Sequence, residues 1–497
     1  MCIRDSNWVH QPFESLSFVT SPADSAWVQW FLLAHDNKQF EKALEIADHI
    51  RRRRFYASLP LGGRLLALRW LLAAPNEMLS EEAKLQRQDM LVKYPELAKL
   101  FQDVAKLRQT ISAQPVAPDG TKQTRELSSL FQNLTRMTDL QEHMLHRLAV
   151  RREPSEFSFP PRTSVGQMRK KIRSGQLFVI FFAVDQQLFV YALSKDKYSN
   201  WLVDPSANVH QLTAAILRRW GNHDRNNQLK LELLQDKKWK SESAELLAHL
   251  FPKNAPEDWD SIEELVIVPD GVLWYLPFET LHREQDGGLR PLVSTLKIRY
   301  APTLSLANPH SDFQRPIRKM AVVPGKIFSK DDNQSATETV EKLTALQRET
   351  LLLESPQLAP TRMAAPFWDR LTVLQDISDS KRLPYEWAPA QTEAGKPGNR
   401  LSDWFLLPWG APAQVLLPGF HSPAEDGLKR AGIRNGSELF LTTCGLMATG
   451  ARTVLINRWR SGGQTAYDLI VEFSRELPNS DAATAWQRSV HLTRGPE

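Results

Sequence analysis

The sequence predicts an α/β fold in two halves, preceded by an irregular, tetratricopeptide-like α-helical domain. Up to residue 152, apolar residues recur at the spacing of amphipathic helices. Beyond that point short apolar runs alternate with helical stretches, and this order predicts a parallel-rich sheet covered on both faces. A chain of 497 residues also exceeds the size at which a single hydrophobic core stops growing, so we expect two or three domains.

Composition and charge exclude several classes of protein. The longest purely apolar run, Leu177–Val184, has eight residues, whereas a membrane-spanning helix needs about 20. We therefore expect no membrane-spanning segment and no membrane partner. The net charge of +5 is spread along the chain rather than gathered in one basic arm. This dispersion argues against a nucleic-acid partner.

The cysteine content limits both the chemistry and the expected compartment. The first six residues, MCIRDS, lack the order of a signal peptide and are interpreted as a sequence-assembly scar; the abrupt end at Gly495–Glu497 leaves open whether the chain is a fragment. With Cys2 set aside, Cys444 is the only thiol, which excludes an internal disulfide and a thiolate metal cluster. We expect no metal and no other cofactor. Sparse cysteine suits a reducing compartment, so the cytoplasm is the expected location.

The first predicted domain, residues 7–155, is helical. Two antiparallel helices are expected within Ser25–Arg54, divided at His35–Asn37. Prolines separate the later helices, which are predicted over Leu61–Leu72, Glu81–Val92, Leu97–Ile111 and Thr124–Arg152. The helix pairs resemble a tetratricopeptide array without its clean repeat of about 34 residues. The basic run Arg51–Arg54 at a helix end is interpreted as interacting with the helix dipole and solvent.

The next predicted domain, residues 163–310, follows a proline-rich linker over residues 153–162 and forms the first half of the α/β fold. A strongly apolar hairpin, two helices and a strand that stops at Pro269-Asp270-Gly271 are expected in turn. A further strand and the start of a helix complete this half. These elements are predicted over Gln176–Val184, Gln187–Leu193, Val209–Arg219, Ser241–Leu250, Leu265–Val268, Leu292–Tyr300 and from Ala301 onward.

The last predicted domain, residues 318–497, forms the second half and alternates regularly between strands and helices. Strands are predicted over Met320–Val323, Leu371–Leu374, Val415–Leu417 and Arg452–Trp459, and helices over Ala336–Leu352, Glu438–Ala448 and Gln464–Glu476. A loop rich in Pro, Gly and Ala is expected over residues 378–400. In such sheets the functional sites lie at the carboxyl ends of the strands, so candidate residues are sought there.

Three segments resemble the CHAT domain family, a caspase- and separase-like peptidase fold often attached to tetratricopeptide helices. They are LVIVPDGVLWYLPFETL within Glu264–Leu281, IRYAPTLSL at Ile298–Leu306 and ATGARTVLINRW at Ala448–Trp459. The resemblance extends from about Gly166 to the end of the chain. It implies a caspase-like α/β sandwich whose first half is not catalytic and whose second half carries a His and a Cys in active members.

Both catalytic positions implied by the resemblance are occupied by other residues. Active members place the His after one strand of the second half and the Cys at the end of the next strand. In this chain Asp376 stands at the first position and Phe420 at the second, with a separation close to the caspase spacing of about 50 residues. An aspartate cannot replace the imidazole base of this dyad, and phenylalanine cannot attack a carbonyl. The resemblance therefore implies a peptidase fold without its usual catalytic pair.

Two alternative catalytic sets stay open. His421 follows the lost Cys position directly, so a relocated dyad of His421 and Cys444 is one alternative. Against it, a helix over Glu438–Ala448 runs away from the strand edge, and a free cysteine among apolar residues is usually buried. The second alternative is a serine-type triad of Asp376, His421 and Ser422, but Ser422 lacks the G-x-S-x-G turn that exposes a nucleophile.

The remaining candidate residues follow the last strand. Arg458, Trp459 and Arg460, together with Ser422, are expected to line any cleft that binds a peptide. Active members follow this tryptophan with an acidic residue, whereas Ser461-Gly462-Gly463 stands here. We therefore expect a catalytically inactive regulatory or scaffolding protein that binds a protein or peptide partner. The alternative is a cysteine-type endopeptidase that uses His421 and Cys444, and the oligomeric state is left open.

Overall fold

The structure is a computed structural model of the whole chain. The predicted linker over residues 153–162 and the predicted loop over residues 378–400 lie largely outside the residues that it describes, and the first six residues lie wholly outside them. The described residues are 24–115, 120–151, 159–203, 206–220, 232, 235–252, 259–308, 317–346, 349–353, 368–378, 385–387, 400–405, 412–422 and 435–493.

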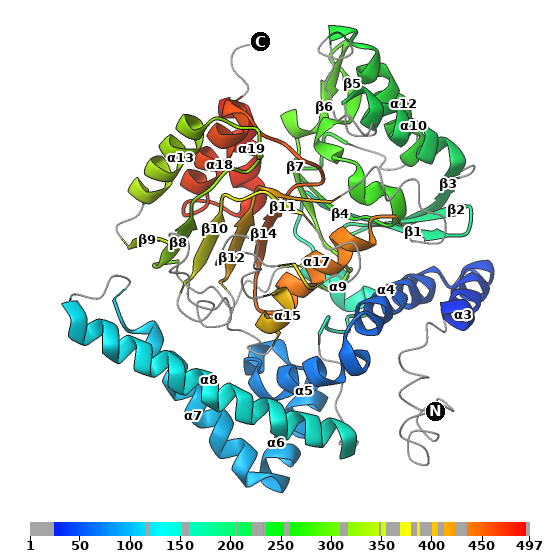
Figure 1. The fold of residues 1–497 in the computed structure, drawn as a ribbon. Helices are drawn as coiled ribbons and strands as arrows, with labels where there is room; N and C mark the ends of the chain where they lie inside the picture. The colour runs from blue at the N-terminus through cyan, green and yellow to red at the C-terminus, as the bar shows by residue number, and fades with distance from the viewer. Residues whose placement is uncertain are drawn as a thin grey trace.

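The N-terminal region is helical, as predicted, and lies along one side of the two sheets (Figure 1). Its first two helices are antiparallel and turn at Lys38, which has a positive φ of 60°. Ser80 caps one of the later helices, because its hydroxyl accepts a hydrogen bond from Ala83 N at 3.0 Å. The helices are α3 (Asp24–Asp36), α4 (Phe40–Ala57), α5 (Arg64–Ala73), α6 (Glu81–Lys93), α7 (Pro95–Ser112) and α8 (Gly120–Arg151).

The first sheet has the strand order β3-β2-β1-β4-β7. Strands β1, β2 and β3 are antiparallel neighbours, whereas β4 pairs in parallel with both β1 and β7. The strands are β1 (Gln176–Val184), β2 (Gln187–Leu193), β3 (Tyr198–Val203), β4 (Glu264–Val268) and β7 (Lys297–Tyr300). The predicted hairpin and the predicted strand before Pro269 are confirmed, and β3 was not predicted.

The second sheet is entirely parallel and has the order β14-β12-β10-β8-β9. Its strands are β8 (Met320–Val323), β9 (Thr350–Leu352), β10 (Arg370–Val373), β12 (Gln414–Leu417) and β14 (Thr453–Ile456). Beyond its carboxyl edge, β11 (Ile377–Ser378) and β13 (Phe420–His421) form a separate two-stranded parallel pair. This pair brings together the chain segments that contain Asp376 and His421.

Helices cover both faces of both sheets, which confirms the predicted α/β fold. One face of the first sheet packs against α3 and α4, and the other packs against α10 (Ser206–Arg219) and α12 (Lys238–Leu250). One face of the second sheet packs against α13 (Asn333–Ala345), α18 (Gln464–Glu476) and α19 (Ala482–Thr493). Its other face packs against α17 (Ser437–Ala448) and the N-terminal helices.

Several predicted elements end at other residues or have another form. The predicted helix Ala336–Leu352 is α13 followed by the edge strand β9, because a short apolar run does not distinguish a helix end from a buried strand. The predicted strand Leu292–Tyr300 starts with a buried 3₁₀ turn, Leu292–Ser294, and only then enters β7. The predicted strand Arg452–Trp459 is limited to Thr453–Ile456.

The helix predicted from Ala301 is wrong for the described residues up to residue 308, which form turns. Asp48 of α4 gives the physical reason. Its carboxylate accepts a hydrogen bond from Leu304 N at 2.7 Å, and the Thr303 hydroxyl accepts one from Leu306 N at 3.3 Å. Side chains therefore satisfy backbone donors of this segment that a helix would satisfy internally.

The structure corrects the interpretation of the basic run Arg51–Arg54, which was expected to interact with the helix dipole and solvent. Arg51 and Arg52 are buried rather than directed to solvent. Arg51 donates to the carbonyl of Phe181, and Arg52 Nε donates to the carbonyl of Pro160 at 2.7 Å. These side chains join the helical region to the α/β fold.

Asp270 of the Pro-Asp-Gly turn has a structural role. It is buried, and its two oxygens accept hydrogen bonds from Ala183 N at 3.0 Å and Gly271 N at 3.1 Å. Arg54 of α4 approaches the same carboxylate at 3.4 Å. The turn therefore connects β4 to the end of β1 and to the helical region.

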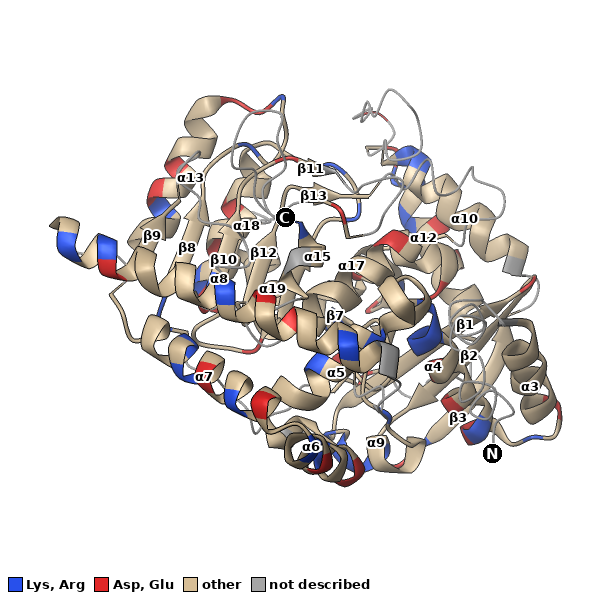
Figure 2. Ribbon diagram, turned by 60° about the horizontal axis from the view of Figure 1, so that its bottom comes forward, with Lys and Arg blue, Asp and Glu red and all other residues tan. Residues whose placement is uncertain are grey.

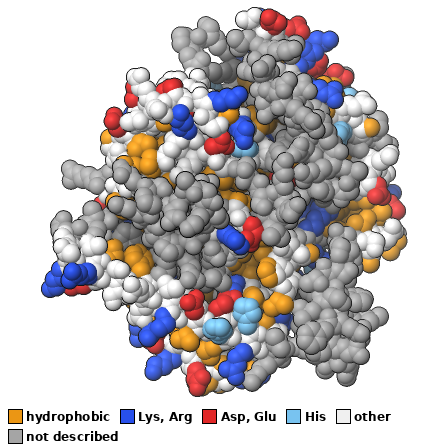
Figure 3. Space-filling view, in the orientation of Figure 1, with side chains coloured by type: hydrophobic (Ala, Val, Ile, Leu, Met, Phe, Trp, Pro, Cys, Tyr) orange, Lys and Arg blue, Asp and Glu red, His pale blue; other side chains and the backbone are white. Residues whose placement is uncertain are grey.

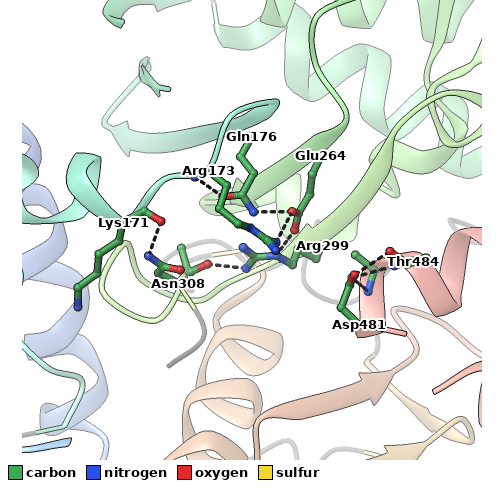
Figure 4. Close-up of polar contacts among 10 residues, drawn as sticks. Lys171, Arg173, Gln176, Glu264, Arg299, Asn308, Asp481 and Thr484 are labelled. Atoms are coloured by element: carbon green, nitrogen blue, oxygen red, sulfur yellow. Dashed lines mark hydrogen bonds and ion pairs between the residues drawn. The ribbon is translucent and has the colours of Figure 1, made fainter. Parts of the chain in front are cut away.

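Glu264 lies at the opposite end of β4, in a dense polar cluster (Figure 4). Its carboxylate accepts hydrogen bonds from Arg299 Nε and Gln176 Nε2, both at 2.5 Å, and from Arg173 at 3.3 Å. Arg299 also donates to the carbonyl of Ala307 at 2.5 Å. Because Gln176, Glu264 and Arg299 belong to β1, β4 and β7, the cluster fixes the register of the parallel strands.

The helical region and the second half share one hydrophobic core. Trp70 Nε1 of α5 donates to the carbonyl of Ala448 at the end of α17 at 2.8 Å. The hydroxyls of Ser58 and Tyr385 lie 2.6 Å apart. Apolar side chains of α5, α7 and α8 belong to the same buried cluster as those of β8, β10, β12 and α17. The domain boundaries at residues 155, 163, 310 and 318 therefore stay a prediction.

Candidate functional site

The candidate site lies at the carboxyl edge of the second sheet, where β10 and β12 continue into β11 and β13. Two glycines permit the close crossing of these segments. A Cβ on Gly419 would lie 2.0 Å from Gln375 O, and a Cβ on Gly325 would lie 2.4 Å from Leu374 O. The sequence prediction that Asp376 and His421 belong to neighbouring strand ends agrees with this geometry.

Asp376, His421 and Arg460 form a charged cluster at this edge. His421 Nε2 lies 2.9 Å from Asp376 Oδ1 and 3.1 Å from Arg460 Nε, while Arg460 Nε lies 3.7 Å from Asp376 Oδ1. Ser329 N donates to the second oxygen of Asp376 at 3.3 Å. The Arg460 side chain is 42% exposed, so the cluster reaches solvent on the arginine side.

A single ring nitrogen of His421 meets both an acceptor and a donor. A carboxylate only accepts and a guanidinium only donates, so Nε2 donates to Asp376 when it carries a proton and accepts from Arg460 when it does not. The neutral imidazole therefore has one tautomer for each partner. The cluster can hold a proton, but a peptidase reaction would also require a nucleophile within reach.

The carboxyl of Asp376 remains ionised over a wide pH range. Partial burial by itself raises its pKa, but the hydrogen bond from His421 and the positive charge of Arg460 outweigh this effect and lower the pKa below the usual value. Asp376 is therefore a permanent negative charge near neutral pH. It orients His421 and pairs with Arg460.

Phe420 lies in the core beside this cluster. Its side chain is fully buried, and its ring centroid lies 5.0 Å from that of Trp387. The position at which the family resemblance places a cysteine is thus filled by an aromatic ring that packs against another one. This packing explains why the residue is apolar, and it offers no group that could attack a carbonyl.

Cys444 is also fully buried, on α17. Its neighbour Gly445 packs so closely that an added Cβ would lie 3.1 Å from both Leu401 and Tyr385. Burial raises the pKa of the Cys444 thiol well above its usual value, and the nearby Asp48 carboxyl adds to this effect. The thiol has the surroundings of a structural core residue.

Ser422 and Arg458 engage each other through the backbone. The Ser422 hydroxyl donates to the carbonyl of Arg458 at 2.9 Å, and Ser422 N donates to the same oxygen at 3.3 Å. Ser422 is buried. The hydroxyl is therefore committed to holding the end of β13 against the segment that follows β14.

Arg458 and Trp459 contact the first half of the fold. Arg458 Nε donates to the carbonyl of Trp274 at 3.1 Å, and its guanidinium lies 4.4 Å from the ring centroid of Tyr300. The Trp459 ring lies 6.0 Å from the Trp220 ring at the end of α10. The two halves therefore meet at these side chains, while Arg460 remains at the sheet edge.

The first half contributes site neighbours that sequence reasoning did not name. Trp274 and Tyr300 belong to segments whose CHAT resemblance was noted for architecture only. Nothing in the sequence assigned Trp220 to a site, and its ring centroid lies 6.0 Å from that of Trp239. The resemblance to the CHAT family, which implies two stacked halves, was the only feature of the sequence that indicated contacts between the halves.

The described surface has charges of both signs. Figure 2 shows Lys and Arg interspersed with Asp and Glu along α6, α7 and α8, and Figure 3 shows the same mixture on the exposed face of the Figure 1 view. Across the parts of the chain that the structure describes, no group of three His, Cys, Asp or Glu residues is arranged to hold a metal ion. None of the described helices has both the length and the apolar character needed to cross a membrane.

Comparison with known proteins supports the sequence resemblance. The family model described as the CHAT domain matches residues 240–388, so the resemblance to this family is confirmed over that range. Two of the three resembling segments lie inside the matched range. The third, Ala448–Trp459, lies outside it and stays a prediction.

Other comparisons add less. No curated protein matches the sequence. Among solved structures, the chain is similar to a chain in the crystal structure of the Saccharomyces cerevisiae separase–securin complex, with 9% sequence identity and a TM-score of 0.40. The similarity covers 94% of this chain and 43% of that chain, which is therefore spanned over less than half of its length. The resemblance to the CHAT family therefore rests on the match over residues 240–388.

Proposed function

We propose that this CHAT-domain protein has no peptidase activity and acts as a regulatory or scaffolding protein that binds a protein or peptide partner. The observation that carries the proposal is the position of Cys444, the one described thiol, inside the core. A thiol nucleophile must be accessible and must deprotonate readily. Burial opposes both requirements at Cys444.

The charged cluster supports binding rather than bond cleavage. Asp376, His421 and Arg460 contact one another at the strand edge. Beside them, Phe420 offers an apolar ring and the Ser422 hydroxyl donates to the carbonyl of Arg458, so neither residue supplies a nucleophile to His421. The partly exposed guanidinium of Arg460 is suited to pairing with a carboxylate. An acidic residue of a partner peptide is therefore the expected contact at this edge.

The alternative function is a cysteine-type endopeptidase that uses His421 and Cys444. It requires α17 to move so that the thiol leaves the core and reaches the strand edge. Such a movement would break the hydrogen bond from Trp70 to Ala448 and expose the shared core. No contact in the described residues favours this rearrangement, so the inactive function is the one proposed.

A labelling experiment separates the two functions. In the full chain carrying Cys2→Ser, we expect no reaction of Cys444 with thiol-directed peptide electrophiles until the protein is unfolded, because the thiol is buried. Mass spectrometry of the labelled chain provides the measurement. Labelling of the folded chain, combined with peptide hydrolysis that Cys444→Ala abolishes, would overturn the proposal.

Partner binding requires its own test. When a displayed peptide library is selected for binding to the full-length chain, we expect the recovered peptides to contain an acidic residue. Arg460→Ala should weaken the binding of these peptides about tenfold, because one charge-assisted hydrogen bond contributes roughly 1.5–3 kcal/mol. The matched control is Arg136→Ala, which removes an exposed arginine of α8. Equal loss in both variants, or selection of no peptide, would contradict binding at this edge.

A further inference from the structure

Arg370, the first residue of β10, is a fully buried cation in the second sheet. Met320 of β8 and Gln414 of β12 flank it in the parallel register, so these three side chains share one face of the sheet. Helix α18 covers that face (Figure 1), and the Arg370 guanidinium reaches the carbonyl of Ser474 on this helix. The positive charge therefore lies between the sheet and a helix, away from solvent.

Neutral groups accept the hydrogen bonds of this guanidinium. Its Nε donates to Gln414 Oε1 at 2.5 Å, and Nη1 donates to the carbonyl of Ser474 at 3.1 Å and to the weak acceptor Met320 Sδ at 3.6 Å. The third nitrogen, Nη2, is buried and has no hydrogen-bond partner among the described residues. Both N–H donors of Nη2 are therefore unsatisfied by the described part of the chain.

The acidic side chains next to Arg370 in the sequence and on α18 are engaged elsewhere. Asp369 accepts hydrogen bonds from two backbone N–H groups that precede β8, at 2.9 and 3.1 Å. On α18, Glu472 and Glu476 pair with arginines of α18 and α19. Burial lowers the pKa of Arg370 to about 10, and no neighbouring carboxylate contributes to this pKa. At neutral pH the side chain is therefore a buried positive charge without a counter-charge among the described residues.

A second buried arginine has a different environment. Arg69 of α5 is 5% exposed, and its guanidinium pairs with the Glu142 carboxylate of α8, whose Oε2 lies 3.1 Å from Nε. The attraction of this carboxylate compensates part of the cost of removing the arginine charge from water. A buried ion without such a partner is much more costly, so the environment of Arg370 favours binding of a negative ion.

Two buried hydroxyl groups lie on the same side of the second sheet as Arg370. Ser474 is 1% exposed, and its Oγ has no hydrogen-bond partner in the described chain, although its carbonyl accepts from Arg370. Thr372 lies two residues beyond Arg370 on β10, so its side chain points to the same face, and its buried Oγ1 also has no partner there. A hydroxyl and Nη2 can both donate, so one negatively charged acceptor satisfies them together.

We propose that a small monovalent anion, such as chloride, binds between β10 and α18, where it accepts hydrogen bonds from Arg370 Nη2 and the Ser474 hydroxyl. A halide ion supplies both the acceptor and the negative charge, whereas a buried water molecule supplies hydrogen bonds alone. The bound anion joins the second sheet to the helix that follows Arg460. The site lies at the amino end of β10, opposite to the end that leads to Asp376, and it does not depend on the proposed function.

The chloride dependence of the full-length chain tests the site. Equilibrium dialysis measures the binding of radioactive chloride. Thermal unfolding is followed while chloride replaces gluconate, an anion too large for the site, at constant ionic strength, so that the screening of surface charges does not change. We expect the chain to bind about one chloride ion. Chloride should raise the thermal midpoint by about 3 °C, because a ligand that binds only the native state stabilises it.

Two variants and a control locate the anion. Arg370→Met removes the charge and keeps a long apolar side chain, so the bound chloride and the shift of the midpoint should both be lost. Ser474→Ala should weaken chloride binding about tenfold, because it removes one hydrogen bond to an ion. Ser489→Ala is the matched control and should leave chloride binding unchanged, because the buried Ser489 hydroxyl already donates to the carbonyl of Ala485 at 2.6 Å.

The proposal is overturned if the folded chain binds no chloride, or if chloride and gluconate give the same thermal midpoint. It is also overturned if Arg370→Met keeps the chloride dependence, because the anion then binds elsewhere. Circular dichroism establishes that each variant is folded. If Arg370→Met does not fold, Ser474→Ala decides the question, and a chloride affinity equal to that of the unmodified chain overturns the site.

Discussion

Two carboxylate–arginine clusters in this chain differ in almost every physical respect. Glu264, in the first half, lies at the amino end of β4 with its side chain 8% exposed, between Arg299 and Gln176 (Figure 4). Asp376, in the second half, lies beyond the carboxyl end of β10 with its side chain 20% exposed. Its arginine, Arg460, is 42% exposed.

The difference separates a structural cluster from a candidate binding site. Around Glu264, the donors come from adjacent strands and the charges are used within the fold. Around Asp376, the contacts come from segments that follow the strands, and the guanidinium of Arg460 is accessible to a partner. Charged residues alone therefore do not mark a site; their position relative to the strand ends and to solvent does.

The largest effect on stability is expected from a substitution of Glu264. Glu264→Gln should lower the free energy of unfolding by about 3 kcal/mol, because it removes one partner of a largely buried ion pair and leaves Arg299 without a counter-charge. Chemical denaturation measures the change. The control Arg173→Gln removes an exposed partner of the same carboxylate and should cost less than about 1 kcal/mol. Equal losses would show that burial does not distinguish the clusters.

A smaller effect is expected at Asp376. Asp376→Asn should cost about 1.5 kcal/mol near neutral pH through weaker bonds to His421 and Ser329. The folded-state pKa of Asp376 is lowered, so its contribution is complete above the unfolded value of about 3.9 and is lost as the pH falls toward the folded value. The stability difference between the two chains should therefore be constant above about pH 5 and shrink in acid. A difference that grows in acid would contradict the assigned pKa direction.

The smallest effect is expected at Arg458, which connects the two halves. Arg458→Lys should cost about 1 kcal/mol, because lysine keeps the charge but loses the planar contact with the Tyr300 ring and the Nε hydrogen bond to Trp274. Thermal unfolding provides the measurement. If Arg458→Lys instead weakens peptide binding and leaves stability unchanged, Arg458 belongs to the candidate binding site around Asp376.

Much of the fold could be predicted from local patterns. The β1–β2 hairpin was predicted at its observed residues, because its strands are uninterrupted apolar runs around Asp185-Gln186. The end of α13 and the start of β7 were missed, since three or four apolar residues suit a helix, a strand or a buried turn equally well. The turns after Ala301 depend on Asp48, which lies far away in the sequence.

The candidate site could be predicted only in part. The register of the resemblance placed Asp376 and Phe420 at the two catalytic positions, and His421 was a candidate because it follows Phe420 directly. The structure brings Asp376 and His421 within hydrogen-bonding distance. The Arg458 contact with Tyr300 joins residues of different halves, and no local pattern encodes such a contact. The burial of Arg51 and Arg52 was missed for the same reason, because a basic helix end looks alike in solvent and under a sheet.

The hydrogen bond from Trp70 to the carbonyl of Ala448 joins the helical region to the second half of the α/β fold. Helices α5, α7 and α8 share a hydrophobic core with the second half, so they cover one face of its parallel sheet. Removing them would leave the apolar underside of the parallel sheet in water, a surface prone to self-association. Helix α5 is therefore in direct contact with α17, the helix that carries Cys444.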